Sequence, residues 1–190
     1  KYISVVCAQP ILSNPSSSTS YSASGATTYG GFYSALPADS APTNKILKSL
    51  RLPFRVNTAK IDTLAGQRYV MFHAKTKGIV VSDAPTAARP DSDYTRLSTV
   101  RQVKAAIDAV RAAGEPFLGE GLTGARLAAL DTAIDSALKV LVKRGVLSRY
   151  DHLVSSTPQQ RVLGQATVEL KLVPAFELRQ ITVVVALAAV

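Results

Sequence analysis

Two stretches in the second half of the chain carry apolar residues at helical spacing. The stripe of the first stretch is formed by Leu97, Val100, Val103, Ile107 and Val110. Asp91 and Asp93 precede it as candidate helix caps, and Gly114 followed by Pro116 marks where a helix would end. The sequence therefore predicts a first amphipathic helix within these limits.

The stripe of the second stretch is formed by Leu127, Leu130, Ile134, Leu138 and Leu141. Thr123 can cap a helix here, because its hydroxyl can accept a hydrogen bond from one of the first free backbone N–H groups. Gly145 stands where a glycine would close the helix. A second amphipathic helix is therefore expected between Thr123 and Gly145.

Strand-like alternation follows the helices. Residues 165–173 alternate apolar residues with Thr167, Glu169 and Lys171, which predicts a strand with one solvent-exposed face. From residue 181 the chain runs Ile-Thr-Val-Val-Val-Ala-Leu-Ala-Ala-Val, which is apolar on both faces of a strand. Such a strand is either central in its own sheet or paired with another chain, because an exposed apolar edge would aggregate. The pattern indicates assembly.

The first half of the chain is less regular. Residues 1–8 alternate like a buried strand, and residues 9–28, rich in Ser, Thr and Pro, are expected to form a surface loop. Residues 68–74 and 78–83 are typical of a hairpin. We expect an α+β fold, an α/β-like sandwich in which the two long helices pack on a mixed sheet. Residues 1–90 would form its upstream part and residues 91–190 its C-terminal domain.

Charge is unevenly distributed along the 190 residues, whose formal net charge is +9. Residues 1–90 contribute +7 and residues 91–190 only +2, and most of the excess lies in residues 45–77. This basic region favours either an anionic partner or a solvated surface that keeps the chain soluble. The apolar run at the C-terminus is shorter than the roughly 20 residues that a membrane span needs, so no membrane insertion is expected.

Enzyme and metal signatures are incomplete. The single cysteine, Cys7, cannot form an internal disulfide and is expected to be a buried apolar side chain in a strand. The segment from Gly25 to Gly30 has the glycine spacing of a phosphate-binding loop but lacks the lysine that must follow it. His73 and His152 are widely separated and give no zinc set with Cys7. We therefore expect no cofactor and no catalytic centre.

Several segments resemble, in their order, a known family. They are Ser24-Gly-Ala-Thr-Thr-Tyr-Gly-Gly-Phe-Tyr-Ser-Ala-Leu, Pro42-Thr-Asn-Lys-Ile-Leu, Ser82-Asp-Ala-Pro-Thr, Asp93-Tyr-Thr-Arg-Leu-Ser-Thr-Val-Arg and Glu115-Pro-Phe-Leu-Gly-Glu, followed by the strands after Gly164. This order resembles the C-terminal conserved domain of contractile tail sheath proteins from phages, phage-tail bacteriocins and related injection systems. Because full sheath proteins normally have an upstream arm and outer domains, we expect these parts to be absent from this chain, or the protein to be unusually small.

The resemblance implies a structural subunit that polymerises in stacked rings around a rigid tail tube and contracts to drive the tube through a target envelope. Its partners would be copies of itself and the tube protein, with baseplate and tail terminator proteins as further candidates. It would reside in a virion tail or phage-tail-like particle assembled in the host bacterial cytoplasm. In this family terminal arms add strands to sheets of neighbouring subunits, which here implicates Ile181, Thr182, Val183, Val184, Val185, Ala186 and Leu187.

The resemblance also places the C-terminal domain next to the tube, so basic residues on the helices become candidates to face it. They are Arg101, Lys104, Arg126, Lys139, Lys143 and Arg144. For the last three, favourable charge near a helix C-terminus explains the residues equally well. If the chain is a sheath subunit, no nucleic acid is expected as a partner. The alternative function is a basic nucleic-acid-binding module. That module would use residues 45–77 and would stack bases on Tyr69 and Phe72.

Overall fold

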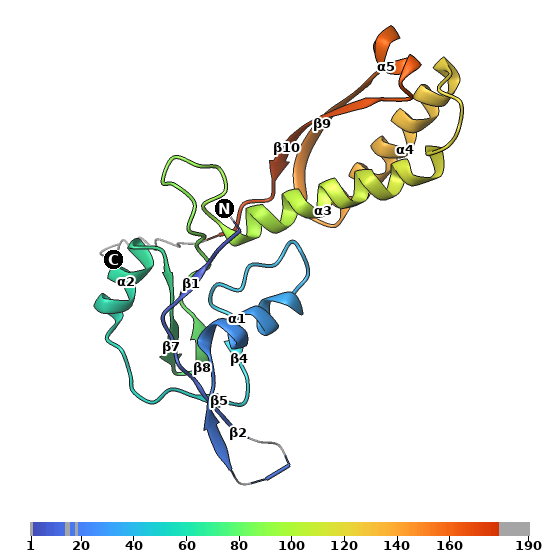
Figure 1. Ribbon diagram of the computed structural model, residues 1–190. Coiled ribbons are helices and arrows are strands. Elements are labelled where there is room, and N and C mark those ends of the chain that lie inside the picture. Colours follow the sequence, from blue (N-terminus) through green and yellow to red (C-terminus); the bar gives the residue numbers. More distant parts are fainter. Residues whose placement is uncertain (1, 14–15, 18, 179–190) are drawn as a thin grey trace, which may run out of the picture.

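The chain folds into two lobes that differ in shape (Figure 1). The computed structural model describes residues 2–13, 16–17 and 19–178. The first lobe contains the elements from β1 to β8, and the second, elongated lobe contains α3, α4, β9, α5 and β10. The predicted α+β class is confirmed, and the division into residues 1–90 and 91–190 stays a prediction.

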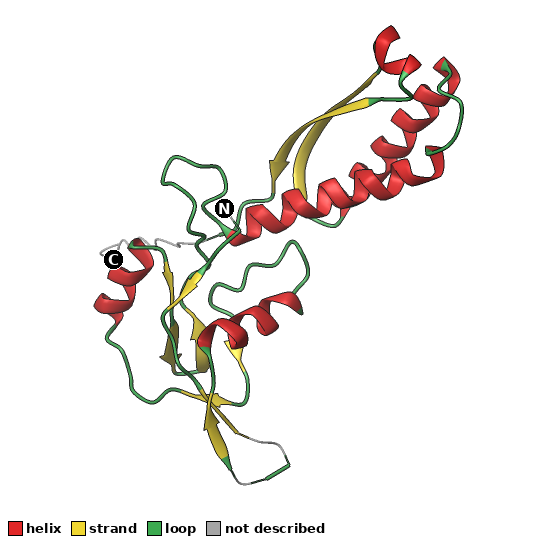
Figure 2. Cartoon of the chain, viewed as in Figure 1, coloured by secondary structure: helices red, strands yellow, loops and turns green. Residues whose placement is uncertain are grey.

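Short strands dominate the first lobe, and long helices dominate the second (Figure 2). The helices are α1 (Gly25–Ser34), α2 (Thr58–Gly66), α3 (Leu97–Gly114), α4 (Gly124–Lys143) and α5 (Pro158–Val162), with a 3₁₀ turn at Glu115–Phe117. The strands are β1 (Val5–Val6), β2 (Ile11–Ser13), β3 (Ser20–Ser22), β4 (Ile46–Leu47), β5 (Leu50–Arg51), β6 (Tyr69–Val70), β7 (Phe72–Lys75), β8 (Gly78–Val81), β9 (Leu147–Ser155) and β10 (Thr167–Pro174).

The predicted hairpin is the centre of the first lobe. β7 and β8 pair antiparallel with Lys75 opposite Gly78, and β4 joins the other edge of β8. β6 pairs parallel with β1. Val70, Phe72 and other apolar side chains of this region form one buried cluster with Tyr29 of α1. Burial of this cluster is what fixes α1 against the strands.

The start of the chain differs from the sequence expectation. Instead of a buried strand, residues 2–8 contain only the two-residue β1, and Ile3 and Cys7 are exposed. The expectation of a buried Cys7 was therefore wrong. The expected loop at residues 9–28 contains the β2–β3 pair, in which Ile11 lies opposite Ser22, and the first turn of α1. Backbone hydrogen bonds thus form two short strands in a segment for which the composition alone favoured a loop.

α3 and α4 form an antiparallel helical hairpin in the second lobe (Figure 1). Thr123 caps α4 by accepting a hydrogen bond from the backbone N–H of Arg126, as predicted, and Gly145 closes it at a φ of 73°. α3 ends at Gly114 as predicted, but its N-cap residue is Arg96 and no side chain bonds there. Asp91 and Asp93 are therefore not its caps.

The two long helices pack on an antiparallel pair, β9 and β10, which lies along one side of them (Figure 2). β10 alternates as predicted, with Glu169 and Lys171 exposed. β9 was not predicted. The sheet that the helices cover is thus an isolated antiparallel pair within the described residues, whereas a mixed sheet was expected.

α3 connects the two lobes physically. Its first residue, Leu97, is buried in the cluster of the first lobe, and Ala106 is buried in the cluster of the second lobe with Ile134 and Leu138 of α4. α3 therefore contributes to the cores of both lobes and links them.

No helix in the described residues is both long and apolar enough to cross a membrane.

Candidate assembly interface

The free edge of β10 is the most distinctive feature of the second lobe. β10 pairs with β9 along one edge, with Val168 opposite Val154 and Leu170 opposite His152. Within the described ranges no strand pairs with its other edge. Backbone N–H and C=O groups along such an edge are available to another strand.

A long apolar groove runs beside this edge, between α3 and β10. One part, of about 800 Å³, is lined by Val103 and Ile107 of α3 and by Leu170 and Leu172 of β10. A second part, of about 940 Å³, shares Ile107 and Leu170 and continues to the far end of the lobe. The two parts therefore adjoin at Ile107 and Leu170, and together we call them the groove.

The groove explains why three of the five residues in the predicted stripe of α3 are incompletely covered. Val103, Ile107 and Val110 are only half-buried, whereas Ala106 is fully buried. The face of α3 that packs on α4 consists of small residues, and its larger apolar side chains point toward the groove. Apolar surface of this extent beside an open strand edge is typical of an interaction site.

The opposite side of the sheet is closed by contacts between β9 and α4. The hydroxyl of Tyr150 donates to Asp135 Oδ1 at 2.7 Å, and His152 Nε2 lies 3.1 Å from Asp131 Oδ1. Burial, together with the neighbouring Asp135 carboxylate, raises the pKa of Tyr150 to about 12. Hydrogen bonds from Lys139 and Tyr150 hold the pKa of Asp135 below its usual value. These contacts hold the helix-facing side of β9 on α4, while the outer edge of β9, like that of β10, has no strand partner within the described residues.

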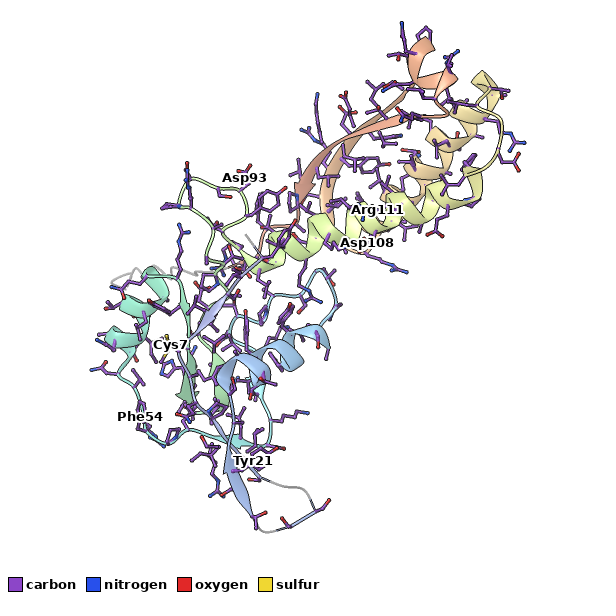
Figure 3. All side chains as sticks on the ribbon, viewed as in Figure 1. Cys7, Tyr21, Phe54, Asp93, Asp108 and Arg111 are labelled. Atoms are coloured by element: carbon purple, nitrogen blue, oxygen red, sulfur yellow. The ribbon has the colours of Figure 1, made fainter. Side chains whose placement is uncertain are left out.

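Four of the six basic candidates are already engaged within the chain. Arg101 donates to the carbonyl oxygens of Leu36 and Pro37 and lies over the ring of Tyr33, 5.3 Å from its centroid. Lys104 pairs with Asp108, which Figure 3 shows on α3.

The two remaining engaged candidates lie on α4. Arg126 pairs with Glu120 at 2.7 Å, and Lys139 pairs with Asp135 at 2.6 Å. Each of these cations has lost part of its capacity to attract an external partner.

Lys143 and Arg144 differ from the other four candidates. Both are exposed at the C-terminal end of α4, and neither has an acidic partner among the described residues. Their charge is free to act on the helix dipole or on another molecule. The seven residues proposed for the shared strand, 181–187, lie outside the described residues.

The first lobe presents the basic region as a mainly exposed surface. Lys45, Lys48 and Arg51 are exposed, but the expected stacking residue Phe72 is buried and Tyr69 is half-buried. The exposed aromatic residues near this region are instead Phe54 and Tyr21, at the end of the lobe farthest from α3 (Figure 3). The nucleic-acid alternative therefore loses one of the two aromatic groups on which it depended.

Comparisons with solved structures decide the fold. The chain is similar to a chain of the anti-feeding prophage (AFP) helical sheath in its contracted state, with a TM-score of 0.78 and 18% identity over 96% of this chain and 55% of that one. The fold is that of contractile sheath proteins. The PVC sheath complex of an extracellular contractile injection system, also contracted, gives a TM-score of 0.75 and 19% identity over 94% of this chain and 55% of that one.

The sheath fold also occurs in a baseplate structure. A chain of the AFP baseplate, 6-fold symmetrised, gives a TM-score of 0.77 and 19% identity over 95% of this chain and 53% of that one. No family model and no curated protein matches the sequence. The chain spans about half the length of the solved chains that it matches. The expected resemblance to sheath proteins is confirmed at the level of the fold.

The sequence did not reveal a buried ionic cluster at the boundary of the lobes. Arg96, Asp83 and Glu177 meet there, although they are separated by up to 94 positions. Asp83 and Arg96 each lie in a segment that carries the family resemblance, but neither segment indicates that the two residues pair. Among the described residues no group of three or more candidate metal ligands occurs.

Proposed function

We propose that this chain is a structural subunit of a contractile sheath that polymerises around a tail tube and contracts. The single observation that carries the proposal is the free edge of β10 beside the apolar groove of α3, within a sheath fold. A sheath must hold its subunits together while they move. Strand addition meets this need, because main-chain hydrogen bonds join subunits through a connection that can hinge.

The occupant of the groove is residues 181–187 of a second copy. One face of that strand, with Ile181, Val183 and Val185, would cover Val103 and Ile107. At about 3.3 Å per residue seven residues span roughly 23 Å. β10 has eight residues, so the lengths match.

The opposite face of the added strand is also apolar, with Val184 and Ala186. It would lie on the outer side of the sheet, where Leu153 of β9 and Val173 of β10 are exposed. The outer side of the sheet also carries the exposed Glu169 and Lys171, so it continues the apolar surface of the added strand only at Leu153 and Val173. A strand that is apolar on both faces fits an interior position in an assembly.

Lys143 and Arg144 are the basic residues that we propose to face the tube. They are exposed and unpaired within the described part of the chain, whereas Lys104, Arg126 and Lys139 have carboxylate partners. Exposed charge contacts contribute about 0–1 kcal/mol each, so they can attract the tube and still release it during contraction. A baseplate is a further partner, and the proposed role is mechanical, with no catalytic centre.

The experiment is negative-stain electron microscopy of the 190-residue chain at high concentration, beside a variant truncated after Gln180. The full chain should form regular hollow cylinders. The truncated chain should remain dispersed. Its melting temperature should equal that of the full chain, because the removed residues follow the described core. Cylinders of normal length from the truncated chain would contradict strand addition. Dispersed full-length protein that shifts labelled oligonucleotides would overturn the sheath proposal in favour of nucleic-acid binding.

A further inference from the structure

A buried arginine joins three chain segments where the two lobes meet. Arg96, immediately before α3, donates from Nη1 and Nη2 to the two carboxylate oxygens of Asp83, at 2.8 and 2.5 Å. Its Nε donates to Glu177 Oε1 at 2.5 Å. The three side chains are 11–15% exposed. We call these three residues the Arg96 cluster.

The geometry of the cluster requires arginine. A planar guanidinium can bind one carboxylate with two parallel N–H groups and a second carboxylate with Nε, whereas a lysine ammonium is a single point of charge. The paired carboxylates in turn raise the pKa of Arg96 against the opposing effect of its burial. Arg96 is therefore a charged link between Asp83, after β8, and Glu177, after β10.

The chain beside Glu177 is held by a second set of bonds. The Gln102 side chain, almost fully buried on α3, donates to the carbonyl of Ala175 at 2.8 Å. The backbone N–H of Ala175 donates to Val146 at 3.2 Å. Pro174 is buried as well. The segment from Pro174 to Glu177 is thus bound along the N-terminal part of α3.

The side chains of this segment alternate between the protein and the solvent. Glu177 points into the Arg96 cluster, whereas Phe176 and Leu178 are 76% and 79% exposed. Phe176 also lines the near end of the groove together with Arg96. The cluster therefore decides which face of the segment is turned outward at the point where the described chain ends.

We infer that Arg96 is a positioning residue for assembly: by binding Glu177 it fixes the path of residues 174–178 and thus the direction in which the last segment leaves the subunit. The consequence for assembly rests on the proposed function, because it concerns the strand that the segment precedes. The local part of the inference, that Glu177 adds to the bonds by which Gln102 and Val146 hold this segment, depends only on this chain. Loss of Glu177 should free the segment and leave Arg96 paired with Asp83.

Hydrogen exchange on the soluble chain tests the local part. In Glu177→Ala the amide of Ala175, which donates to the carbonyl of Val146, should exchange at least tenfold faster, while amides in the middle of α4 are unchanged. Asp62→Ala is the matched control, because Asp62 is an exposed acid on α2, away from β10, with no ion-pair partner among the described residues. Glu177→Gln should give an intermediate rate, because an amide oxygen still accepts one hydrogen bond.

A purely structural role predicts a different pattern. If the cluster only stabilised the fold, Glu177→Ala would lower protection throughout α3 and α4 and Glu177→Gln would not rescue the segment selectively. Arg96→Lys gives a second measurement that does not depend on removing Glu177. It should raise exchange of the Ala175 amide, since one ammonium cannot bind both carboxylates in this geometry. Unchanged exchange of the Ala175 amide in both variants would overturn the inference.

Electron microscopy of the same variants tests the consequence for assembly. Glu177→Ala should raise the concentration at which cylinders form by tenfold or more, and Asp62→Ala should leave it unchanged. Cylinders at the wild-type concentration from a variant with a freed segment would overturn the positioning role. If the wild-type chain forms no cylinders, the proposed function and its link to Arg96 both fail, while the exchange rates still decide whether Glu177 holds the segment.

Discussion

Tyr150 of β9 and Asp135 of α4 are joined by a 2.7 Å hydrogen bond across the closed side of the second lobe. The phenol is the donor and the carboxylate is the acceptor. Burial and this bond raise the pKa of Tyr150, and hydrogen bonds from Lys139 and Tyr150 lower the pKa of Asp135. This pair fixes β9 on α4 and leaves β10 as the strand with the open groove.

The first prediction concerns the pH dependence of stability. The pKa of Tyr150 rises to about 12 in the folded chain, while that of an unfolded tyrosine is about 10. Its contribution to the free energy of unfolding is complete below pH 10 and is lost as the pH rises toward 12, because the unfolded state releases the proton more easily. Denaturant midpoints measured at closely spaced pH values should show this fall in the wild type.

Tyr150→Phe is the control for this prediction. The decrease in the free energy of unfolding that Tyr150 causes above pH 10 should be absent in the variant. The difference in this free energy between the wild type and the variant should therefore shrink between pH 10 and 12. At the acid end the lowered pKa of Asp135 contributes stability above its unfolded pKa of about 4, lost as the pH falls through the folded value. A constant difference between the two proteins from pH 7 to 12 would contradict the assignment of Tyr150.

The second prediction concerns the groove. Ile107 is half-buried and lines both parts of it. Ile107→Thr keeps the β-branched shape and places a hydroxyl in the apolar contact, so it should lower monomer stability by about 1 kcal/mol or less. The concentration needed for cylinders should rise about tenfold, equivalent to about 1.4 kcal/mol. Light scattering against protein concentration gives this threshold.

Asp108→Asn is the neighbouring control, because Asp108 is exposed and pairs only locally with Lys104 (Figure 3). It should leave the threshold within twofold of the wild type. If Ile107→Thr assembles as the wild type does, the groove does not receive the second copy. An equal loss in both variants would instead point to a general effect on α3.

The predictable parts of this fold are those specified by local signals. α4 was predicted between Thr123 and Gly145, because a hydroxyl cap and a left-handed glycine act on neighbouring backbone groups. The start of α3 was wrongly predicted, since Asp91 and Asp93 have cap chemistry but Leu97 is drawn into the core of the first lobe. There, tertiary burial outweighed the local signal.

β9 and the Arg96 cluster were missed for a different reason. The inward side of β9 carries Tyr150 and His152, whose polar atoms make them look like surface residues until Asp135 and Asp131 are placed opposite them. The Arg96 cluster joins residues far apart in sequence, so no local window contains it. The open groove was also invisible, because a helical stripe does not show which of its residues a partner covers.

The third prediction separates two roles of Lys143 and Arg144. The double variant Lys143→Gln, Arg144→Gln should reduce co-sedimentation with purified tube by about tenfold, and the loss should be smaller at high salt, because salt already screens the wild-type charges. If the cations act only on the dipole of α4, the variant should lose about 0.3–1 kcal/mol of stability per charge and bind the tube normally.

Lys104→Gln, Arg126→Gln is the matched control for charge removal from the helices. Both cations already pair with carboxylates in the chain. This variant should sediment with the tube as the wild type does. Equal loss of binding in the two double variants would mean that net charge, and not the end of α4, governs the contact.

The last prediction uses two glycines of α1 and requires no partner. A Cβ at Gly25 would lie 1.9 Å from the carbonyl oxygen of Ala8, so Gly25→Ala must displace backbone and should destabilise the chain by about 2–3 kcal/mol. Gly31 lies in the same helix, and a Cβ there meets nothing within 4 Å. Gly31→Ala should therefore stabilise by about 0.5–1 kcal/mol, since alanine restricts the unfolded chain and favours the helix. Chemical denaturation measures the change in the free energy of unfolding for each variant. If the two changes have opposite signs, the close approach of α1 to Ala8 explains the glycine at position 25, which resembled part of a phosphate-binding loop in the sequence. Equal effects would show that α1 does not approach residue 8 this closely.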